Sequence, residues 1–380
     1  MARIKMGFVG CGFPFFFHTD GAEDSQFVEY TAVHDINYEL ACEVAEGFTA
    51  NEMKACRTLE ELLAEDIDAV LVSVPHDIHE EIVEQCVNAG KHVLCEKPMA
   101  MTLEGCRKMI ADAERNGVRL MIAENHRFLP IHNAMHDVIA KGLVGDVCLV
   151  RTYEGCNEIE ANENPDTWKG DLYRCGGCWL DMSVHKFGCL EYILGDRVES
   201  VMMLMSKQVA TLPMKGDDNA ICIATFQSGA MAEITVSSTQ VSPANNSTEI
   251  YGDKGSIIEN HEGEPALRIY SEADEAGDMA YDWDEPEVHH GAFPDYYFIS
   301  GRNTDDHFAQ CLLEGTPFAY TLEDATSAVT CALMGYLSFI EKRPVKREEI
   351  LAMAETASLY KRVDGLIPTK GAQPAEDAPA

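Results

Sequence analysis

Basic residues are scarce in this sequence. Lysine and arginine together number 29, against 64 aspartate and glutamate residues, which gives a formal net charge of −35. Proteins that bind nucleic acids or anionic membrane surfaces use clustered lysine and arginine side chains, and the sequence has no such cluster. We therefore expect neither nucleic acid nor membrane as a partner.

Long apolar runs are also missing. No stretch approaches the roughly 18 consecutive apolar residues that indicate a membrane-spanning helix. The first ten residues hold no long apolar segment before a small-residue cleavage site, so they do not resemble a secretory signal. The 14 cysteines are scattered from Cys11 to Cys331, mostly at apolar positions, as is typical of free thiols in a reducing compartment. These features predict a cytoplasmic protein.

The length of 380 residues suggests two domains, at about 150 residues per domain. Residues 1–127 alternate strand and helix patterns. Strands are expected at 4–9, 28–35, 69–74, 92–95 and 119–125. This alternation predicts an α/β fold with a parallel, doubly wound sheet in the first domain.

The pattern changes after about residue 128. Longer strand-like runs follow, at 148–154, 198–207, 220–226, 232–238 and 248–251. With a helix expected at 182–194, they predict an α+β domain over 128–345 with a large, open, mostly antiparallel sheet. We expect a C-terminal helix within 346–370, a disordered acidic tail over 371–380 and an exposed acidic loop over 271–287.

A glycine turn ends the first predicted strand. Gly10 and Gly12 supply the tight turn and the close backbone approach of a dinucleotide-binding turn, whereas Phe15 stands where the third glycine of that fingerprint would be. Asp35 ends the second strand, where a carboxylate accepts hydrogen bonds from ribose hydroxyls and repels a 2′-phosphate. The combination favours NAD over NADP. The alternatives are an ordinary glycine turn and a solvated acid at the end of a strand.

Lys97 follows a parallel strand in the tripeptide Glu96-Lys97-Pro98. Ligands bind at the carboxyl edge of such sheets. The proline favours an extended Lys97 that would point into the crevice, where its ammonium could stabilise a developing alkoxide. The alternative is a surface lysine before a turn.

Asp181 and His185 are four residues apart and share one face of a predicted helix. Histidine is the side chain suited to moving a proton near neutral pH. This pair could therefore carry acid–base chemistry. The alternative interpretation is structural, with Asp181 capping the helix and His185 bonded to it.

These motifs together resemble the Gfo/Idh/MocA family of oxidoreductases, which includes inositol dehydrogenase and glucose–fructose oxidoreductase. The resemblance rests on the turn of Gly10 and Gly12, Glu96-Lys97-Pro98, Asn125-His126-Arg127-Phe128-Leu129-Pro130 and Asp181-x-x-x-His185, which occur in the family's order. Weaker similarity continues at Gly252-Asp253-Lys254-Gly255 and Thr321-Leu322-Glu323-Asp324. The match covers nearly the whole chain.

The resemblance implies an N-terminal Rossmann domain and a C-terminal domain that binds substrate and often mediates homo-oligomers. It also implies Lys97, Asp181 and His185 as catalytic residues and NAD as cofactor. The residues expected to bind the cofactor are Gly10, Gly12, Phe13, Pro14, Asp35, Ser73, Pro75, His79, Glu96, Lys97 and Asn125. Phe15, and Cys178 in the glycine-rich stretch before Asp181, depart from the family pattern.

Several polar and aromatic residues are candidates for binding the substrate. Trp168 lies in a polar loop ahead of the predicted helix and could stack on a sugar or on nicotinamide; an anchor in the domain core is the alternative. Arg127, Tyr153 and the stretch 289–297 are comparable candidates. The expected substrate-binding residues are Lys97, Arg127, Tyr153, Trp168, Asp181 and His185.

A metal site is a competing use of some of these residues. Cys175 and Cys178 have the spacing of zinc ligands, and His289 and His290 could join Asp181 and His185. No second Cys-x-x-Cys pair occurs at zinc-finger spacing. We therefore expect no bound metal.

The sequence favours an NAD-dependent dehydrogenase that oxidises a secondary hydroxyl of a sugar, glycoside or cyclitol. His185 would take the hydroxyl proton, Lys97 would hydrogen-bond the same oxygen, and Asp181 would orient the substrate or the imidazole. One alternative is an enzyme of the same fold that uses bound NAD for a transient oxidation, for example at C3, that leads to cleavage of a glycosidic bond. Another is a non-catalytic sensor of dinucleotide or sugar.

Overall fold

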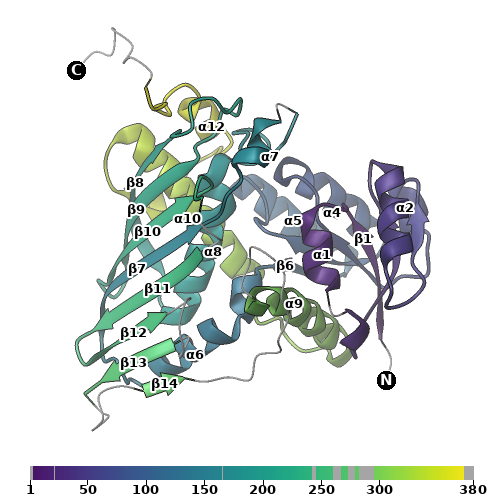
Figure 1. The fold of residues 1–380 in the computed structure, drawn as a ribbon, viewed down its shortest axis with the longest axis horizontal. Coiled ribbons are helices and arrows are strands. Elements are labelled where there is room, and N and C mark those ends of the chain that lie inside the picture. Colours follow the sequence, from purple (N-terminus) through teal and green to yellow (C-terminus); the bar gives the residue numbers. More distant parts are fainter. Residues whose placement is uncertain are drawn as a thin grey trace.

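The structure is a computed structural model that describes residues 3–20, 22–164, 166–241, 245–259, 267–272, 279–281 and 295–371. A parallel sheet with helices on both faces lies beside a larger sheet (Figure 1). Among these residues, the structure has no helix that is both long and apolar enough to span a membrane.

The first unit holds a six-stranded parallel sheet in the order β3-β2-β1-β4-β5-β6. Its strands are β1 (Ile4–Val9), β2 (Val28–His34), β3 (Lys54–Cys56), β4 (Ala69–Val72), β5 (His92–Glu96) and β6 (Leu120–Ala123). The helices between them are α1 (Phe13–Thr19), η1 (Ala22–Asp24), α2 (Tyr38–Gly47), α3 (Leu59–Leu63), η2 (His76–Ile78), α4 (His79–Asn88) and α5 (Leu103–Asn116), and η3 (Asn125–Phe128) follows β6. The predicted doubly wound sheet is confirmed.

The apolar runs of the sequence explain why this sheet is buried on both faces. Every residue of β4 and β6 is buried, as expected for strands that helices cover on both sides. Because all six strands are parallel, the segments after β1, β4 and β5 leave the sheet at the same edge. That edge brings the glycine turn, η2 and Lys97 close together.

The second unit is built on a nine-stranded sheet in the order β14-β13-β12-β11-β7-β10-β9-β8-β15. Its strands are β7 (Val147–Gly155), β8 (Val198–Ser206), β9 (Asn219–Phe226), β10 (Met231–Ser237), β11 (Asn245–Gly252), β12 (Gly255–Glu259), β13 (Leu267–Ser271), β14 (Met279–Tyr281) and β15 (Val345–Lys346). Among its described strands only β7 and β10 pair in parallel, so the predicted mostly antiparallel sheet is confirmed.

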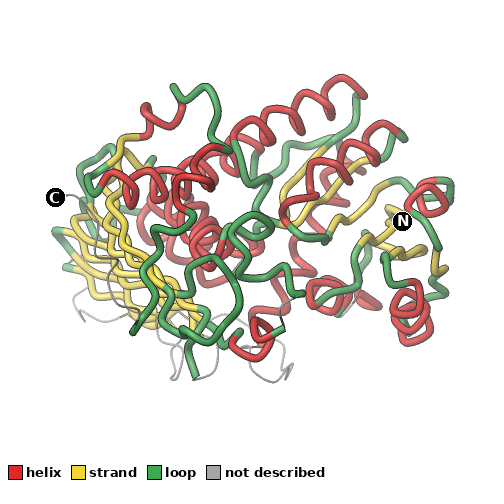
Figure 2. Tube along the Cα trace, turned by 90° about the horizontal axis from the view of Figure 1, so that it is seen from above, coloured by secondary structure: helices red, strands yellow, loops and turns green. Residues whose placement is uncertain are grey.

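Helices lie on one side of this sheet (Figure 2). Helices α8 (Gly177–Leu194) and α10 (Leu322–Glu341) contact the sheet and each other, and α6 (Pro130–Ala140) packs against α8. Helix α7 (Ile159–Glu163) follows β7. Helix α8 is buried along almost its whole length, since it packs against α10 and the strands β7 to β10. Trp179 on α8 is fully buried and donates its indole N–H to the Ala332 carbonyl oxygen on α10 at 2.8 Å.

Helix α9 (Asp295–Glu314) returns to the first unit. It packs against α1, η3, β1, β2 and β6 (Figure 1). Phe308 and Ala309 are fully buried in the same apolar cluster as Phe8 and Tyr30 of the parallel sheet. The core of the first unit therefore includes a helix from late in the chain, which the sequence patterns did not predict.

The C-terminal segment differs from the single helix predicted within 346–370. Two short helices occur there, α11 (Arg347–Leu351) and α12 (Ser358–Val363). The intervening residues include Thr356, which is fully buried and donates from its hydroxyl to Glu104 of α5 at 2.6 Å. The tail 372–380 and most of the predicted acidic loop, 273–278 and 282–287, lie outside the described residues. The domain boundaries stay a prediction.

Candidate active site

The turn after β1 leaves room for a ligand to approach the backbone. Gly10 has φ +97°, a left-handed conformation that favours glycine, and a Cβ there would lie 1.9 Å from the Ser73 carbonyl oxygen. A Cβ on Gly12 would meet nothing closer than 3.7 Å, so internal packing does not require glycine there. Open space at the second glycine is what a pyrophosphate needs to reach the backbone. The turn therefore fits a dinucleotide.

Asp35 is fixed beside this turn. Its Oδ2 accepts the Cys11 N–H at 2.7 Å, and its Oδ1 accepts the Asn37 N–H at 2.8 Å. Both bonds hold the Asp35 side chain just after the C-terminal end of β2, where a carboxylate can accept hydrogen bonds from ribose hydroxyls.

Phe15, at the place of the third glycine, is accommodated in the core. It is 3% exposed, and its ring centroid lies 4.9 Å from that of Phe8 on β1. Phe13 and Phe16, on the same short helix, are more than half exposed. Helix α1 therefore packs on the sheet through an aromatic side chain instead of the close backbone contact that a glycine allows.

Lys97 and Asp181 form the ion pair at the centre of the site. Lys97 Nζ donates to Asp181 Oδ1 at 2.6 Å and to the Asp181 carbonyl oxygen at 2.9 Å. Burial alone would lower the pKa of Lys97, but the Asp181 carboxylate outweighs it and raises that pKa. Burial alone would raise the pKa of Asp181, but Lys97 and Lys169 lower it well below its usual range. Both groups are therefore charged at neutral pH.

His185 lies one turn further along α8. Its Nδ1 is 2.7 Å from Glu124 Oε1, and its ring stacks on that of His126 with centroids 4.4 Å apart. We refer to Lys97, Asp181 and His185 as the Lys–Asp–His group. Lys97 directly follows β5, and Asp181 and His185 lie on α8, so the structure brings together residues that are 84 positions apart in the chain, Lys97 and Asp181.

The structural alternative for Asp181 and His185 is wrong. Helix α8 begins at Gly177, so Asp181 lies inside the helix and does not cap it. His185 bonds Glu124 and not Asp181.

His76 and Trp168 extend the site. His76 Nε2 is 3.6 Å from Asp181 Oδ1, and its Nδ1 bonds the Cys175 carbonyl oxygen at 3.0 Å. Burial lowers the pKa of His76 to about 3, so the ring is neutral. The Trp168 ring lies 4.8 Å from that of His76. Sequence reasoning found Trp168 but missed His76, although its place just after β4 at the ligand-binding edge was a usable signal.

Two predicted cofactor residues have partners inside the protein. The ring nitrogens of His79 each lie 2.9 Å from a backbone carbonyl oxygen, one of Pro98 and one of Val74. Asn125 donates to Ser300 Oγ on α9 at 3.0 Å. These bonds fix the loops after β4, β5 and β6 relative to one another.

Glu96 is held by a buried histidine on α1. His18 Nε2 is 2.8 Å from Glu96 Oε1, and His18 Nδ1 is 2.8 Å from Asp305 Oδ1 on α9. Burial alone would lower the pKa of His18, but the two carboxylates outweigh it and raise the pKa to about 10. The protonated ring therefore joins α1, the end of β5 and α9 next to Lys97.

Arg127 and Tyr153, two predicted substrate-binding residues, contact residues outside the Lys–Asp–His group. Arg127 Nη1 donates to Asn133 Oδ1 at 2.8 Å, and its guanidinium lies 3.6 Å from the centroid of the Tyr192 ring; it lines a cavity of about 380 Å³. Tyr153 donates its hydroxyl to Gln240 at 2.6 Å. Within the described ranges, no hydrogen bond or ion pair joins either residue to the Lys–Asp–His group.

The two cysteines of the Cys-x-x-Cys spacing do not share a site. Cys175 lies near His76 and Asp181, whereas the Cys178 Sγ is 3.6 Å from the Met182 sulfur. Burial raises the pKa of both cysteine thiols. His289 and His290 lie outside the described residues.

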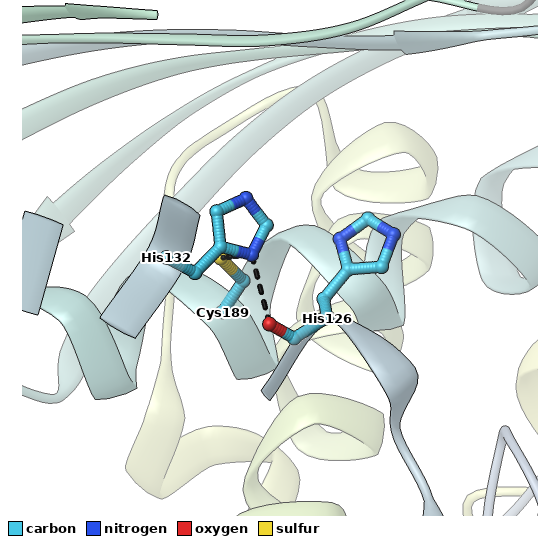
Figure 3. A group of neighbouring side chains, drawn as sticks. All are labelled: His126, His132 and Cys189. Atoms are coloured by element: carbon cyan, nitrogen blue, oxygen red, sulfur yellow. Dashed lines mark hydrogen bonds between the residues drawn. The ribbon is translucent and has the colours of Figure 1, made fainter. Parts of the chain in front are cut away.

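A second cluster with metal-ligand chemistry combines His126, whose ring stacks on His185, with His132 and Cys189 (Figure 3). His132 Nδ1 is 2.8 Å from the His126 carbonyl oxygen and 3.2 Å from Cys189 Sγ. A nitrogen that donates to a carbonyl carries a proton and offers no lone pair to a metal. His132 Nδ1 is therefore used in the hydrogen bond to the His126 carbonyl oxygen and is not a metal ligand here. That the protein binds no metal stays a prediction.

Comparisons with known proteins match both units. The family model described as "Oxidoreductase family, NAD-binding Rossmann fold" covers residues 4–124, and the "GFO/IDH/MocA C-terminal domain" covers residues 132–258. The rhizopine catabolism protein MocA of Rhizobium meliloti is 31% identical over 58% of this chain and 67% of its own length. Myo-inositol 2-dehydrogenase of Thermotoga maritima is 27% identical over 92% of this chain and 100% of its own length.

Solved structures show the same fold. A levoglucosan dehydrogenase in complex with NADH and levoglucosan superposes with a TM-score of 0.80 at 22% identity, covering 91% of this chain and 99% of that one. A probable dehydrogenase from Thermotoga maritima gives a TM-score of 0.74 at 26% identity, with 91% and 100% covered. The motifs, the two folds and these matches agree, and the chain belongs to the Gfo/Idh/MocA family of NAD-binding oxidoreductases.

Proposed function

We propose that this protein is an NAD-dependent dehydrogenase that oxidises a secondary hydroxyl of a sugar, glycoside or cyclitol. The Lys–Asp–His group carries the proposal, because it places an ammonium, a carboxylate and an imidazole at the carboxyl edge of the parallel sheet, near the glycine turn. The names of the relatives, a myo-inositol dehydrogenase and a levoglucosan dehydrogenase, support the substrate class.

Each residue of the Lys–Asp–His group would have a different role toward the substrate hydroxyl. His185 would accept the proton of the hydroxyl, and Lys97 would donate a hydrogen bond to the same oxygen and stabilise its negative charge. Asp181 would keep the ammonium in place and accept from a neighbouring substrate hydroxyl. Bound NAD supplies the hydride acceptor, and the protein contributes position and charge.

Two sets of residues would hold the ligands. For the cofactor we propose the backbone at Gly10 and Gly12, the carboxylate of Asp35, and the further residues Phe13, Pro14, Ser73, Pro75, His79, Glu96 and Asn125. For the substrate we propose the Lys–Asp–His group with Trp168, whose ring lies beside His76. Arg127 and Tyr153 stay predictions with less support, since their described contacts lie elsewhere.

A panel of sugars, cyclitols and glycosides, offered with NAD or with NADP and followed at the nicotinamide absorbance, tests this function. A keto product with stoichiometric NADH is expected for at least one compound. Release of an aglycone without net NADH would indicate glycosidic cleavage through transient oxidation. Binding without turnover across the panel would leave a sensor as the better description.

Replacing Asp35 by asparagine is expected to weaken the preference for NAD over NADP by at least about tenfold. A hydrogen bond to a charged group contributes about 1.5–3 kcal/mol, and the repulsion of a 2′-phosphate disappears with the charge. The asparagine side-chain oxygen can still accept the Cys11 N–H that holds the turn. The ratio of kcat/KM values for the two cofactors is the measurement, and Glu39→Gln, an exposed acid on α2, is the matched control. An unchanged ratio in Asp35→Asn would argue against this role.

We also propose that the protein is a cytoplasmic homo-oligomer. The side of the large sheet away from α8 carries exposed apolar side chains on adjacent strands, namely Leu149, Met202, Leu204, Ile221, Ile223 and Met231. A second copy of the chain could cover this surface. The molar mass by light scattering is expected to exceed one chain, and Leu204→Glu with Ile221→Glu should reduce it. A monomeric mass for the unmodified protein would contradict the proposal.

A further inference from the structure

Glu124 is a buried carboxylate that the proposed chemistry does not use. It lies between β6 and η3 and is 1% exposed. Its Oε1 is 2.7 Å from His185 Nδ1 and also accepts the backbone N–H of His126 at 3.1 Å. Among the described residues its ion-pair partner is His185, with no lysine or arginine in contact.

The local fold does not by itself require a charge at this position. Capping the first N–H of η3 needs a side-chain acceptor, which a neutral amide or hydroxyl also supplies. Burying a carboxylate is costly unless it is paired and hydrogen-bonded. The contact with His185 is the interaction in which the charge of Glu124 makes a difference.

That contact decides which ring nitrogen of His185 carries the proton. A carboxylate accepts hydrogen bonds and does not donate them, so the nitrogen facing Glu124, Nδ1, is the one that bears hydrogen in the neutral ring. Nε2 then keeps its lone pair, as a base that must accept a proton from a hydroxyl requires. The same carboxylate stabilises the ring once it is protonated.

His126 restricts the orientation of the same ring. Its imidazole stacks on that of His185 at 4.4 Å with an interplanar angle of 17°. Its backbone is fixed on both sides, because Glu124 accepts its N–H and His132 donates to its carbonyl oxygen (Figure 3). Burial lowers the pKa of His126 well below its usual value, so this ring stays neutral beside His185.

We propose that Glu124 is a positioning residue that keeps the proton of neutral His185 on Nδ1 and presents the Nε2 lone pair to the substrate hydroxyl. Its kinetic part rests on the proposed function, because only a reaction that removes a proton from the substrate needs His185 as a base. Its structural part, the location of the proton, does not depend on any substrate.

Glu124→Gln tests both parts. The amide retains the shape of the side chain but loses the charge. Its NH₂ can face Nδ1 only if the bond from the His126 N–H, which the same oxygen accepts in the wild type, is given up. In that orientation the imidazole proton lies on Nε2. In the wild type, ¹⁵N chemical shifts are expected to show His185 protonated on Nδ1, with the signal assigned from its loss in His185→Asn. In Glu124→Gln the Nε2-protonated form should appear. We expect kcat to fall by about 10²–10⁴-fold, as when the acid that orients a histidine base is replaced by its amide, with little change in the affinity for NAD.

A matched control, Glu259→Gln, separates this role from a loss of packing. Burial raises the pKa of Glu259 to about 8, so that side chain is already largely neutral at pH 7. Its amide should therefore leave kcat and the His185 signals unchanged.

Three results would overturn the proposal. They are a wild-type His185 protonated on Nε2, a Glu124→Gln variant with the wild-type proton position, and a loss of kcat that Glu259→Gln reproduces. The first needs no variant of Glu124, so it decides the question even if Glu124→Gln fails to fold. If the wild type oxidises no compound in the panel, the proposed function fails, while the ¹⁵N measurement still decides the placement of the proton.

Discussion

His185→Ala is expected to lower kcat by about 10²–10⁴-fold, the usual contribution of a positioned general base. The imidazole is the group that would take the hydroxyl proton, and it is held by Glu124 and by the stacked ring of His126. The affinity for NAD should be unchanged, because the glycine turn and Asp35 lie on other elements. Turnover with the best compound of the panel and NAD binding by calorimetry are the two measurements.

The matched control is His136→Ala. His136 stacks on Tyr192 at 4.6 Å and lies on α6, and in the described chain it makes no contact with the Lys–Asp–His group. The His136→Ala variant should therefore keep a kcat close to that of the wild type. If His185→Ala kept more than about a hundredth of wild-type kcat, the smallest loss expected for a general base would be absent and the assigned role would be wrong.

The second large effect is expected for Lys97→Met. Methionine keeps much of the length of the side chain but removes the ammonium that would stabilise the substrate oxygen. Losing a donor of this kind lowers kcat by about 10²–10³-fold. The variant also leaves Asp181 as a buried carboxylate without its closest partner, and breaking a buried pair in this way costs about 3–5 kcal/mol in the free energy of unfolding.

A double variant separates the two consequences. Lys97→Met combined with Asp181→Asn removes both charges, so the unfolding free energy should recover relative to Lys97→Met alone, while kcat should stay low. Denaturant unfolding and steady-state turnover provide the comparison. Recovery of activity in the double variant would show that Lys97 serves only to compensate Asp181 and takes no part in the chemistry.

The sequence predicted well those parts of the fold that local patterns encode. A few consecutive residues are enough to identify each of them: the continuous apolar runs of β4 and β6, and the glycine turn. Pairings across long distances are not encoded in this way. Spacing could place Asp181 and His185 on one helical face, but it gave no means of choosing Glu124 as the partner of His185 or of locating His76 beside Asp181.

Helix α9 escaped prediction for a related physical reason. Its residues 295–314 include glycine, asparagine and several acids, so its apolar pattern is weak. Its burial depends on contacts with α1 and the parallel sheet, which lie far earlier in the chain. Asp305, for example, pairs with His18 of α1, and no pattern local to either residue contains that information.

The return of α9 has a consequence for any attempt to divide the molecule. A fragment that ends near residue 127 would lack Phe308 and Ala309 and leave one side of the Phe8 and Tyr30 cluster facing water. Such a fragment should expose apolar surface and aggregate. A fragment that also carries residues 295–314 on a linker should cover that surface and aggregate less. The nucleotide-binding half is thus discontinuous along the chain, and chimaeras with relatives must exchange both pieces together.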